Sequence, residues 1–235
     1  MDSILKDLKE QPHIRLLVPL LKRHRCKVYL VGGYLRNLLL NKEDGNRDLD
    51  FAVSKGALEL AKLFSKKIKG FYVVLDKKER CARVIHRLDG KTYTLDFAQF
   101  RGATIKKDLA LRDFTINNLA VDVERIAEAT DQEGIIIDEN GGQADLKRNL
   151  IRMVSIKSFK DDPLRIIRSF SLAATLNFKI DAPTISQAKK YRHKIADSLR
   201  ALEDVWDFLP CKLEKLEVHC GCEYYQEGKQ HYRLR

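Results

Sequence analysis

The order of apolar and polar positions predicts alternating helices and strands along most of the chain. Residues 3–24 place leucine and isoleucine at helical spacing, with a break near Pro12. Two short apolar runs, 28–31 and 47–53, have the character of strands and enclose a helical stretch. Ser54 is then expected to cap a helix that runs through about Ile68.

Three further strands are predicted over residues 71–75, 81–87 and 92–98. The stretches between them are short and rich in turn-forming residues, which favours antiparallel pairing. Alternating strands and helices of this kind indicate an α+β fold with a mixed, largely antiparallel sheet.

The second half of the chain is predicted to become helical. A helix is expected to carry Asp113 and Asn117 on one face, and residues 121–150 are predicted to be loop-rich, with Gly141-Gly142 supplying freedom. Asp161 or Asp162 is expected to cap the next helix, with Pro163 in its first turn. The predicted buried stripe of that helix is Leu164, Ile167, Phe170 and Ala174, and a last helix follows Pro183 to about Leu199.

Composition limits the class of protein. The 235 residues contain 44% hydrophobic residues but no run of eighteen apolar ones, and the N-terminus lacks the form of a signal peptide. We therefore expect a soluble, cytoplasmic protein without a membrane partner. The five cysteines are expected to be reduced thiols, because their number is odd and the protein is expected to be cytosolic. Zinc is not expected, because Cys220-Gly221-Cys222 lacks the spacing of a zinc knuckle.

The charge balance favours a polyanionic partner. Lys and Arg number 44 against 33 Asp and Glu, so the formal net charge is +11. Such an excess suits binding to RNA that weakens as salt rises, although a basic surface also serves solubility alone.

Two carboxylates are the first candidates for chemistry. Asp48 and Asp50 are one residue apart in a predicted strand, so they point to one face while Leu49 and Phe51 point to the core. Their repulsion is removed by a divalent cation, most plausibly Mg²⁺, which is often shared between carboxylates and substrate phosphates. An isolated D-x-D is also common at solvated strand ends.

Arginines are placed to meet an anion near these carboxylates. Gly32 and Gly33 end the first strand and allow a ligand close to the backbone, and Arg36 follows one helical turn later. Arg112 supplies a fork of donors for phosphate. Asp162, Arg165 and Arg168 are three residues apart, which also fits a surface salt-bridge ladder worth little.

These motifs, in this order, resemble those of the class II tRNA nucleotidyltransferases and poly(A) polymerases. The matching stretches are LVGGYLRNLLL with DLD, then DLALRDFTINNLA, then DDPLRIIR, and the resemblance covers about residues 26–200. It departs from the family pattern at Asn37, Leu111, Asp161 and Ser171. The fold implied is a DNA polymerase β-like nucleotidyltransferase head followed by a small α-helical neck.

The resemblance implies a role for each candidate residue. Two Mg²⁺ ions are held by Asp48 and Asp50. Asp96 is either the third carboxylate of the family or an edge-strand Asp that faces water. The triphosphate and sugar are bound by Gly32, Gly33, Arg36, Arg112, Asp113, Asn117 and Arg168. Asp162 and Arg165 read the base edge and thereby select ATP and CTP over GTP and UTP.

The implied domains are an N-terminal helical segment (1–25), a head (26–155), a neck (156–200) and an unassigned segment (201–235). The leading function is addition of CMP and/or AMP to tRNA 3′ ends. A poly(A) polymerase acting on other RNAs and a non-catalytic RNA-binding remnant are the alternatives. Because the resemblance fades after residue 200, a partner chain or a homo-oligomer is expected to help hold tRNA, with Trp206 and Phe208 on the docking surface.

Overall fold

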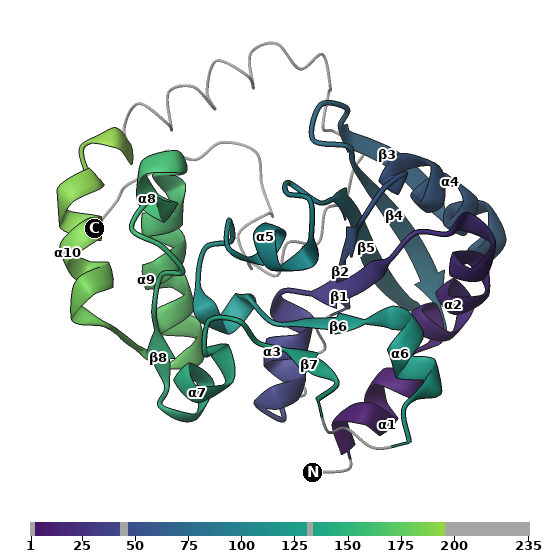
Figure 1. The fold of residues 1–235 in the computed structure, drawn as a ribbon, viewed down its shortest axis with the longest axis horizontal. Coiled ribbons are helices and arrows are strands. Elements are labelled where there is room, and N and C mark those ends of the chain that lie inside the picture. Colours follow the sequence, from purple (N-terminus) through teal and green to yellow (C-terminus); the bar gives the residue numbers. More distant parts are fainter. Residues whose placement is uncertain (1–2, 43–46, 131–133, 196–235) are drawn as a thin grey trace, which may run out of the picture. The chain divides into compact units, whose positions relative to one another are not determined.

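The computed structural model describes residues 3–42, 47–130 and 134–195. The chain divides into two compact units, 1–196 and 197–235, and the second unit, with the predicted segment 201–235, lies outside the described residues. The first unit is an α+β structure with one large sheet and helices beside it (Figure 1).

Two helices open the chain. Helix α1 (Ser3–Glu10) and helix α2 (Pro12–His24) are separated where the sequence predicted a break, because Pro12 occupies the first turn of α2 and cannot continue α1. The side chain of Gln11 caps α2 by accepting a hydrogen bond from the His13 amide.

The sheet has seven strands in the order β3-β4-β5-β2-β1-β6-β7. Strands β2 and β5 pair in parallel, and the other neighbouring pairs are antiparallel. The turn-rich connections predicted this pairing for β3, β4 and β5. The strands are β1 (Val28–Val31), β2 (Asp48–Val53), β3 (Phe71–Asp76), β4 (Cys81–Leu88), β5 (Lys91–Gln99), β6 (Ala120–Asp122) and β7 (Ile136–Ile137).

The two faces of this sheet differ. One face carries the main core, in which the rings of Phe51 and Phe64 pack against Phe97 at centroid distances of 5.0 and 5.8 Å. Helix α4 (Ala57–Ile68) covers β3, β4 and β5 on that side (Figure 1). The opposite face has a small apolar cluster around Val31 and Ala52 and carries the candidate carboxylates beside it.

The predicted cap at Ser54 is wrong. Helix α4 begins after Gly56, which has φ +69° and provides no capping side chain. The hydroxyl of Ser54 instead accepts a hydrogen bond from the Lys27 amide at 2.9 Å. Its capping oxygen is thus used to join β2 to the start of β1.

The loop-rich region predicted for 121–150 is more regular than expected. It contains β6, α6 (Val123–Glu128), β7 and α7 (Gly142–Lys147), and β8 (Leu150–Ile151) follows. The Asp138 carboxylate accepts from the amides of Gly142 and Gln143 at 2.8 and 2.9 Å, which fixes the start of α7. Short elements of this kind leave little hydrophobic period in the sequence.

The C-terminal part of the described chain is helical. It comprises α8 (Ser158–Asp161), α9 (Leu164–Leu176) and α10 (Ala182–Tyr191), with β9 (Lys179–Ile180) pairing in parallel with β8. The predicted helix from 183 to about 199 is therefore shorter among the described residues.

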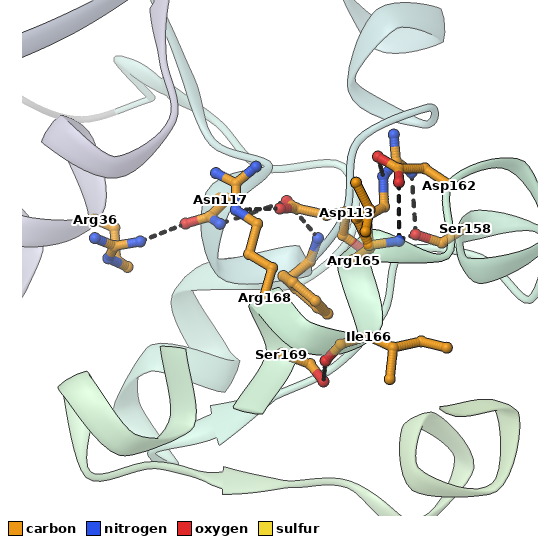
Figure 2. Close-up of polar contacts among 11 residues, drawn as sticks. Arg36, Asp113, Asn117, Ser158, Asp162, Arg165, Ile166, Arg168 and Ser169 are labelled. Carbon is orange, nitrogen blue, oxygen red and sulfur yellow. Dashed lines mark hydrogen bonds and ion pairs between the residues drawn. The ribbon is translucent and has the colours of Figure 1, made fainter. Parts of the chain in front are cut away.

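The predicted buried stripe of α9 is wrong. Ile167 and Phe170 are 46% and 54% exposed, and the buried residues are Ile166, Ser169 and Leu176. A serine can face the interior here because its hydroxyl donates to the Ile166 carbonyl at 2.6 Å (Figure 2). No helix within the described ranges is long and apolar enough to span a membrane.

Candidate active site

Asp48 and Asp50 lie at the centre of the sheet on strand β2. The intervening Leu49 and the following Phe51 are 0% and 1% exposed, so the two carboxylates share the face away from the main core. The two side chains share one face of β2, as the alternation in the sequence predicted.

Asp96 lies directly beside this pair. Strand β5 pairs with β2 in a register that sets Asp96 opposite Asp50, so three carboxylates occupy one region of the sheet. Arg83 stands opposite Asp96 on β4 and donates to both of its oxygens, each at 2.8 Å. Asp96 is therefore paired with an arginine and does not simply face water.

Arg83 is a residue that sequence reasoning missed. The signal was available, because antiparallel pairing about the turn at 88–90 places residues 83 and 96 opposite each other. A bidentate arginine offsets much of the charge of Asp96.

Asp50 is in an unfavourable electrostatic position. Burial raises the pKa of its carboxyl group, and the charges of Asp96 and Asp48 raise it further, whereas Arg112 and Arg168 lower it. The two arginines come from segments far apart in the sequence, so both the loop after α5 and helix α9 direct positive charge at Asp50.

Gly32 allows the backbone to approach this carboxylate. It has φ +80°, and a Cβ atom at this position would lie 2.5 Å from Asp50 Oδ2. Only glycine satisfies both the backbone conformation and the contact. Gly33, the first residue of α3 (Gly33–Leu39), lies similarly close to Arg36, because its Cβ would be 3.3 Å from Arg36 Nη2.

A polar network joins the other candidate residues (Figure 2). Arg36 donates to Asn117 Oδ1 at 2.7 Å and to Asn37 Oδ1 at 2.9 Å. Asn117 in turn donates to Asp113 Oδ1 at 3.4 Å, and Arg168 Nε lies 3.1 Å from Asp113 Oδ2. The network connects α3, the 3₁₀ turn η1 (Thr115–Asn117) and α9.

The helix predicted to carry Asp113 and Asn117 is absent. Asp113 precedes η1, and both side chains are buried, at 6% and 4% exposure. They still meet, because the tight turn folds back on itself and Asp113 also accepts from the Phe114 amide at 2.8 Å. In the free protein these two residues hold Arg36 and Arg168 in place.

Arg112 is held by a buried carboxylate that the sequence did not single out. Asp108, on α5 (Ile105–Leu109), accepts from Arg112 Nη2 at 3.1 Å and from the Arg101 amide at 3.1 Å. The side chain of Arg112 is 19% exposed, so its position is defined while part of the guanidinium remains accessible.

The predicted ladder on α9 divides into two parts. Asp162 Oδ2 lies 3.5 Å from Arg165 Nε, and Asp162 Oδ1 accepts from the Leu164 amide at 3.0 Å. The N-cap of α9 is Pro163, and not Asp161 or Asp162 as predicted. Arg165 also donates to Ser158 at 3.1 Å (Figure 2). Arg168 leaves this ladder and joins Asp113 instead.

A family model for the poly(A) polymerase head domain matches residues 28–152. The chain belongs to this family. Its head domain therefore contains β1 to β8, with Asp48, Asp50, Asp96 and the network around Asn117.

Curated relatives of this head domain are enzymes that extend tRNA. A CC-adding tRNA nucleotidyltransferase from Synechocystis is 37% identical over 77% of this chain and 40% of its own length. An A-adding tRNA nucleotidyltransferase from Aquifex aeolicus is 34% identical over 67% of this chain and 19% of its own length. The chain thus spans less than half the length of these relatives.

Solved structures agree with the fold. The Thermotoga maritima CCA-adding enzyme complexed with tRNA has a TM-score of 0.67 at 35% identity, and the match covers 80% of this chain and 44% of that one. A tRNA-processing enzyme with CTP has a TM-score of 0.63 at 35% identity, covering 74% and 45% of the two chains. The predicted α+β nucleotidyltransferase head is confirmed.

The head domain's carboxylates suit magnesium better than a metal held entirely by protein. Among the described residues, no group of three or more His, Cys, Asp or Glu side chains is arranged to hold a metal ion. Mg²⁺ commonly takes only one or two carboxylates and completes its shell with water and substrate phosphate. The placement of Asp48 and Asp50 on one face of β2, and the raised pKa of Asp50, fit such an ion.

Proposed function

We propose that this chain transfers CMP and/or AMP from CTP or ATP to the 3′ end of tRNA. The observation that carries the proposal is the convergence of Asp48, Asp50 and the cations of Arg112 and Arg168 on one face of the head domain. The relatives that extend tRNA, and the CTP and ATP bound in similar structures, support the substrates.

In this proposal, Asp48 and Asp50 hold two Mg²⁺ ions, which when bound activate the RNA 3′ hydroxyl and stabilise charge at the α-phosphorus. Arg36, Arg112 and Arg168 hold the triphosphate, and Gly32 keeps the backbone clear of the reacting groups. Asp113 and Asn117 position Arg36 and Arg168. Asp96, with its charge shared by Arg83, is the third carboxylate.

Base choice is assigned to the start of the neck, residues 156–200 in this proposal. Asp162 accepts a hydrogen bond from the exocyclic amino group of cytosine or adenine, and Arg165 donates to a neighbouring ring atom. Both side chains already meet in the free protein, and Ser158 steadies Arg165. GTP and UTP present a carbonyl where Asp162 requires a donor.

The product is tested with tRNA. Transcripts ending before the first C, after the first C, after CC and after CCA are incubated with the 235-residue chain, Mg²⁺ and labelled CTP or ATP, and the products are sequenced. We expect extension by CMP first, because two relatives at 37% identity are CC-adding enzymes. Long adenylate tails on an unstructured RNA would favour the second candidate, a poly(A) polymerase. This candidate is retained because the matching family is that of the poly(A) polymerase head domain.

A further inference from the structure

The sheet has an open face beside the candidate carboxylates, on strands β3, β4 and β5. Pairing registers align Asp48, Thr94, Ile85 and Phe71 in one row across β2, β5, β4 and β3. The neighbouring row contains Asp50, Asp96, Arg83 and Val73. Residues directly opposite each other in a sheet share a face, so both rows lead from the carboxylates to the sheet edge.

This open face is accessible and partly apolar. Phe71 is 68% exposed and Leu75 is 48% exposed, whereas Ala82 and Val84, which point to the other side of β4, are 0% exposed. Helix α4 packs on that other side. Phe71 thus presents an exposed aromatic ring in the same row as Asp48.

Beyond the carboxylates, the open face carries two arginines, Arg83 and Arg87. Arg83 takes up both oxygens of Asp96, so the third carboxylate does not act alone against phosphate. Arg87 lies two and four residues beyond Ile85 and Arg83 on the same side of β4 and is exposed. The net charge of the whole chain, +11, has the same sign.

Because β3 lies at the edge of the sheet, the alternative occupant to consider is another protein strand. A shift in pairing register between Val74 and Asp76 interrupts the strand, and the charged turn that follows is fixed by Asp76 accepting from the Lys78 and Glu79 amides. Bulges and charges of this kind disfavour edge-to-edge pairing. The observations therefore favour RNA over a second copy of the chain.

We propose that the open face of β3–β5 binds the single-stranded 3′ end of the RNA and that Phe71 stacks on one of its bases. This inference rests on the proposed function, because the reacting 3′ hydroxyl must reach Asp48 and Asp50. Three strand spacings separate Phe71 from Asp48, about 14 Å, which about four stacked nucleotides span at roughly 3.4 Å each. Aromatic stacking of this kind tolerates any base.

The test uses the full chain with 2-aminopurine placed singly at each of the last four nucleotides of the RNA. We expect fluorescence quenching at one or two of these positions, lost in Phe71→Ala and retained in Phe71→Tyr. The KM for RNA should rise about tenfold in Phe71→Ala, while the KM for CTP stays within about twofold. Leu63→Ala, an exposed apolar residue on the far side in α4, is the matched control and should change neither quantity.

Several outcomes separate this inference from the proposed function. Position-specific quenching with no nucleotide incorporation would retain the RNA surface and overturn the function. Normal incorporation with unchanged RNA binding in Phe71→Ala would overturn the surface and retain the function. A change in sedimentation of Phe71→Ala, with RNA binding unaltered, would assign the open face to a second copy of the chain and would equally overturn the proposal.

Discussion

Asp50 is held where its charge is costly to the free protein. Its pKa is raised mainly by burial and then by Asp96, so the ionised carboxylate destabilises the fold at neutral pH, and this cost is relieved as the pH falls through the raised pKa toward the ordinary value of 3.8. Such a conflict is typical of a position kept for chemistry rather than stability.

We expect Asp50→Asn to abolish nucleotide incorporation in Mg²⁺ and to raise the melting temperature by about 2–4 °C, equivalent to roughly 1 kcal/mol at this chain length. The gain follows from removing a buried charge that its neighbours repel. Asp48→Ala should abolish incorporation as well. Asp89→Asn, in the exposed β4–β5 turn, is the control that should change neither property. Wild-type turnover by Asp50→Asn would remove this residue from the mechanism.

Arg83 and Asp96 form the second testable unit. Because Arg83 holds both oxygens of Asp96, Arg83→Gln leaves an additional uncompensated charge beside Asp50. We expect this variant to lower kcat about tenfold and to shift the Mg²⁺ requirement, while Asp96→Asn lowers kcat by a similar factor. Steady-state kinetics at several Mg²⁺ concentrations distinguish the two. If Asp96→Asn turns over normally at all of them, Asp96 is a structural partner of Arg83 and not a third catalytic carboxylate.

At the scale of the element, the hydrogen bond from the Leu164 amide to Asp162 at the start of α9 allows the role of Asp162 in base choice to be tested with a conservative substitution. Asn at position 162 can keep this hydrogen bond while replacing an acceptor with an amide donor. We expect Asp162→Asn to relax discrimination against GTP and UTP about tenfold, with little loss of stability. Competition assays with all four nucleotides measure the effect, and Arg165→Lys should act in the same direction. Unchanged selectivity in both variants would leave only the salt bridge seen in the free protein.

Helix α2 and strand β4 are joined by a buried histidine pair. His13 is 0% exposed, its Nδ1 lies 3.3 Å from Gln11 Oε1, and its Nε2 lies 2.9 Å from His86 Nδ1. The Gln11 oxygen can only accept, so His13 carries its proton on Nδ1 and accepts from His86. This arrangement requires the ring of His13 to be neutral, because its Nε2 must accept.

The pair predicts acid sensitivity. Burial, followed by the charge of His86, lowers the pKa of His13 from 6.5 to about 4. The unfolded chain therefore binds the proton first, so stability falls as the pH drops from about 6.5 toward 4, by roughly 2–3 kcal/mol at most. Urea unfolding at pH 7 and pH 4.5 measures this loss. His13→Leu should flatten the dependence, whereas His24→Gln, on the exposed end of α2, should leave it unchanged.

The elements also show what sequence can and cannot predict. The alternation at Asp48 and Asp50 was sufficient, because a strand of period two fixes which side chains share a face. The short turn at 88–90 likewise predicted antiparallel strands. The prediction at Ser54 failed because a serine oxygen can accept from a neighbouring strand as readily as from a helix start. The prediction for α9 failed because the hydroxyl of Ser169 donates to a backbone carbonyl, so that a serine can take a buried position expected for an apolar residue.

The site was predictable in composition but not in its connections. Arg36, Arg112 and Arg168 were identified, yet two of them have partners from elements distant in sequence: Asn117 for Arg36, and Asp113 for Arg168. No local pattern encodes such pairs, since they depend on how α3, η1 and α9 pack. Asp108, which holds Arg112, was missed although it lies only four residues away, because a buried Asp on a short helix has no distinctive signal.

At the scale of the whole molecule, the net charge bears on the proposed binding of RNA. With a formal charge of +11, these 235 residues should bind tRNA largely through phosphates, so affinity should fall steeply between 50 and 200 mM salt, by about 10³-fold if some six phosphates are contacted. Fluorescence anisotropy across this range, with a minihelix and an unstructured RNA as competitors, gives the slope. Tight binding that is insensitive to salt and selective for tRNA would show that shape recognition resides within these residues.

The occupied state of Arg36 and Arg168 has a consequence for turnover. Each guanidinium already has a protein acceptor, so in the proposed reaction a triphosphate would compete with Asn117 for Arg36 and with Asp113 for Arg168. This exchange subtracts from affinity for every anion, and it subtracts the same amount from the hold on departing pyrophosphate. The resting acceptors then recapture the arginines as the product leaves. An enzyme that binds a new triphosphate after each added nucleotide would benefit from this exchange, because its arginines return to one defined arrangement before the next substrate binds.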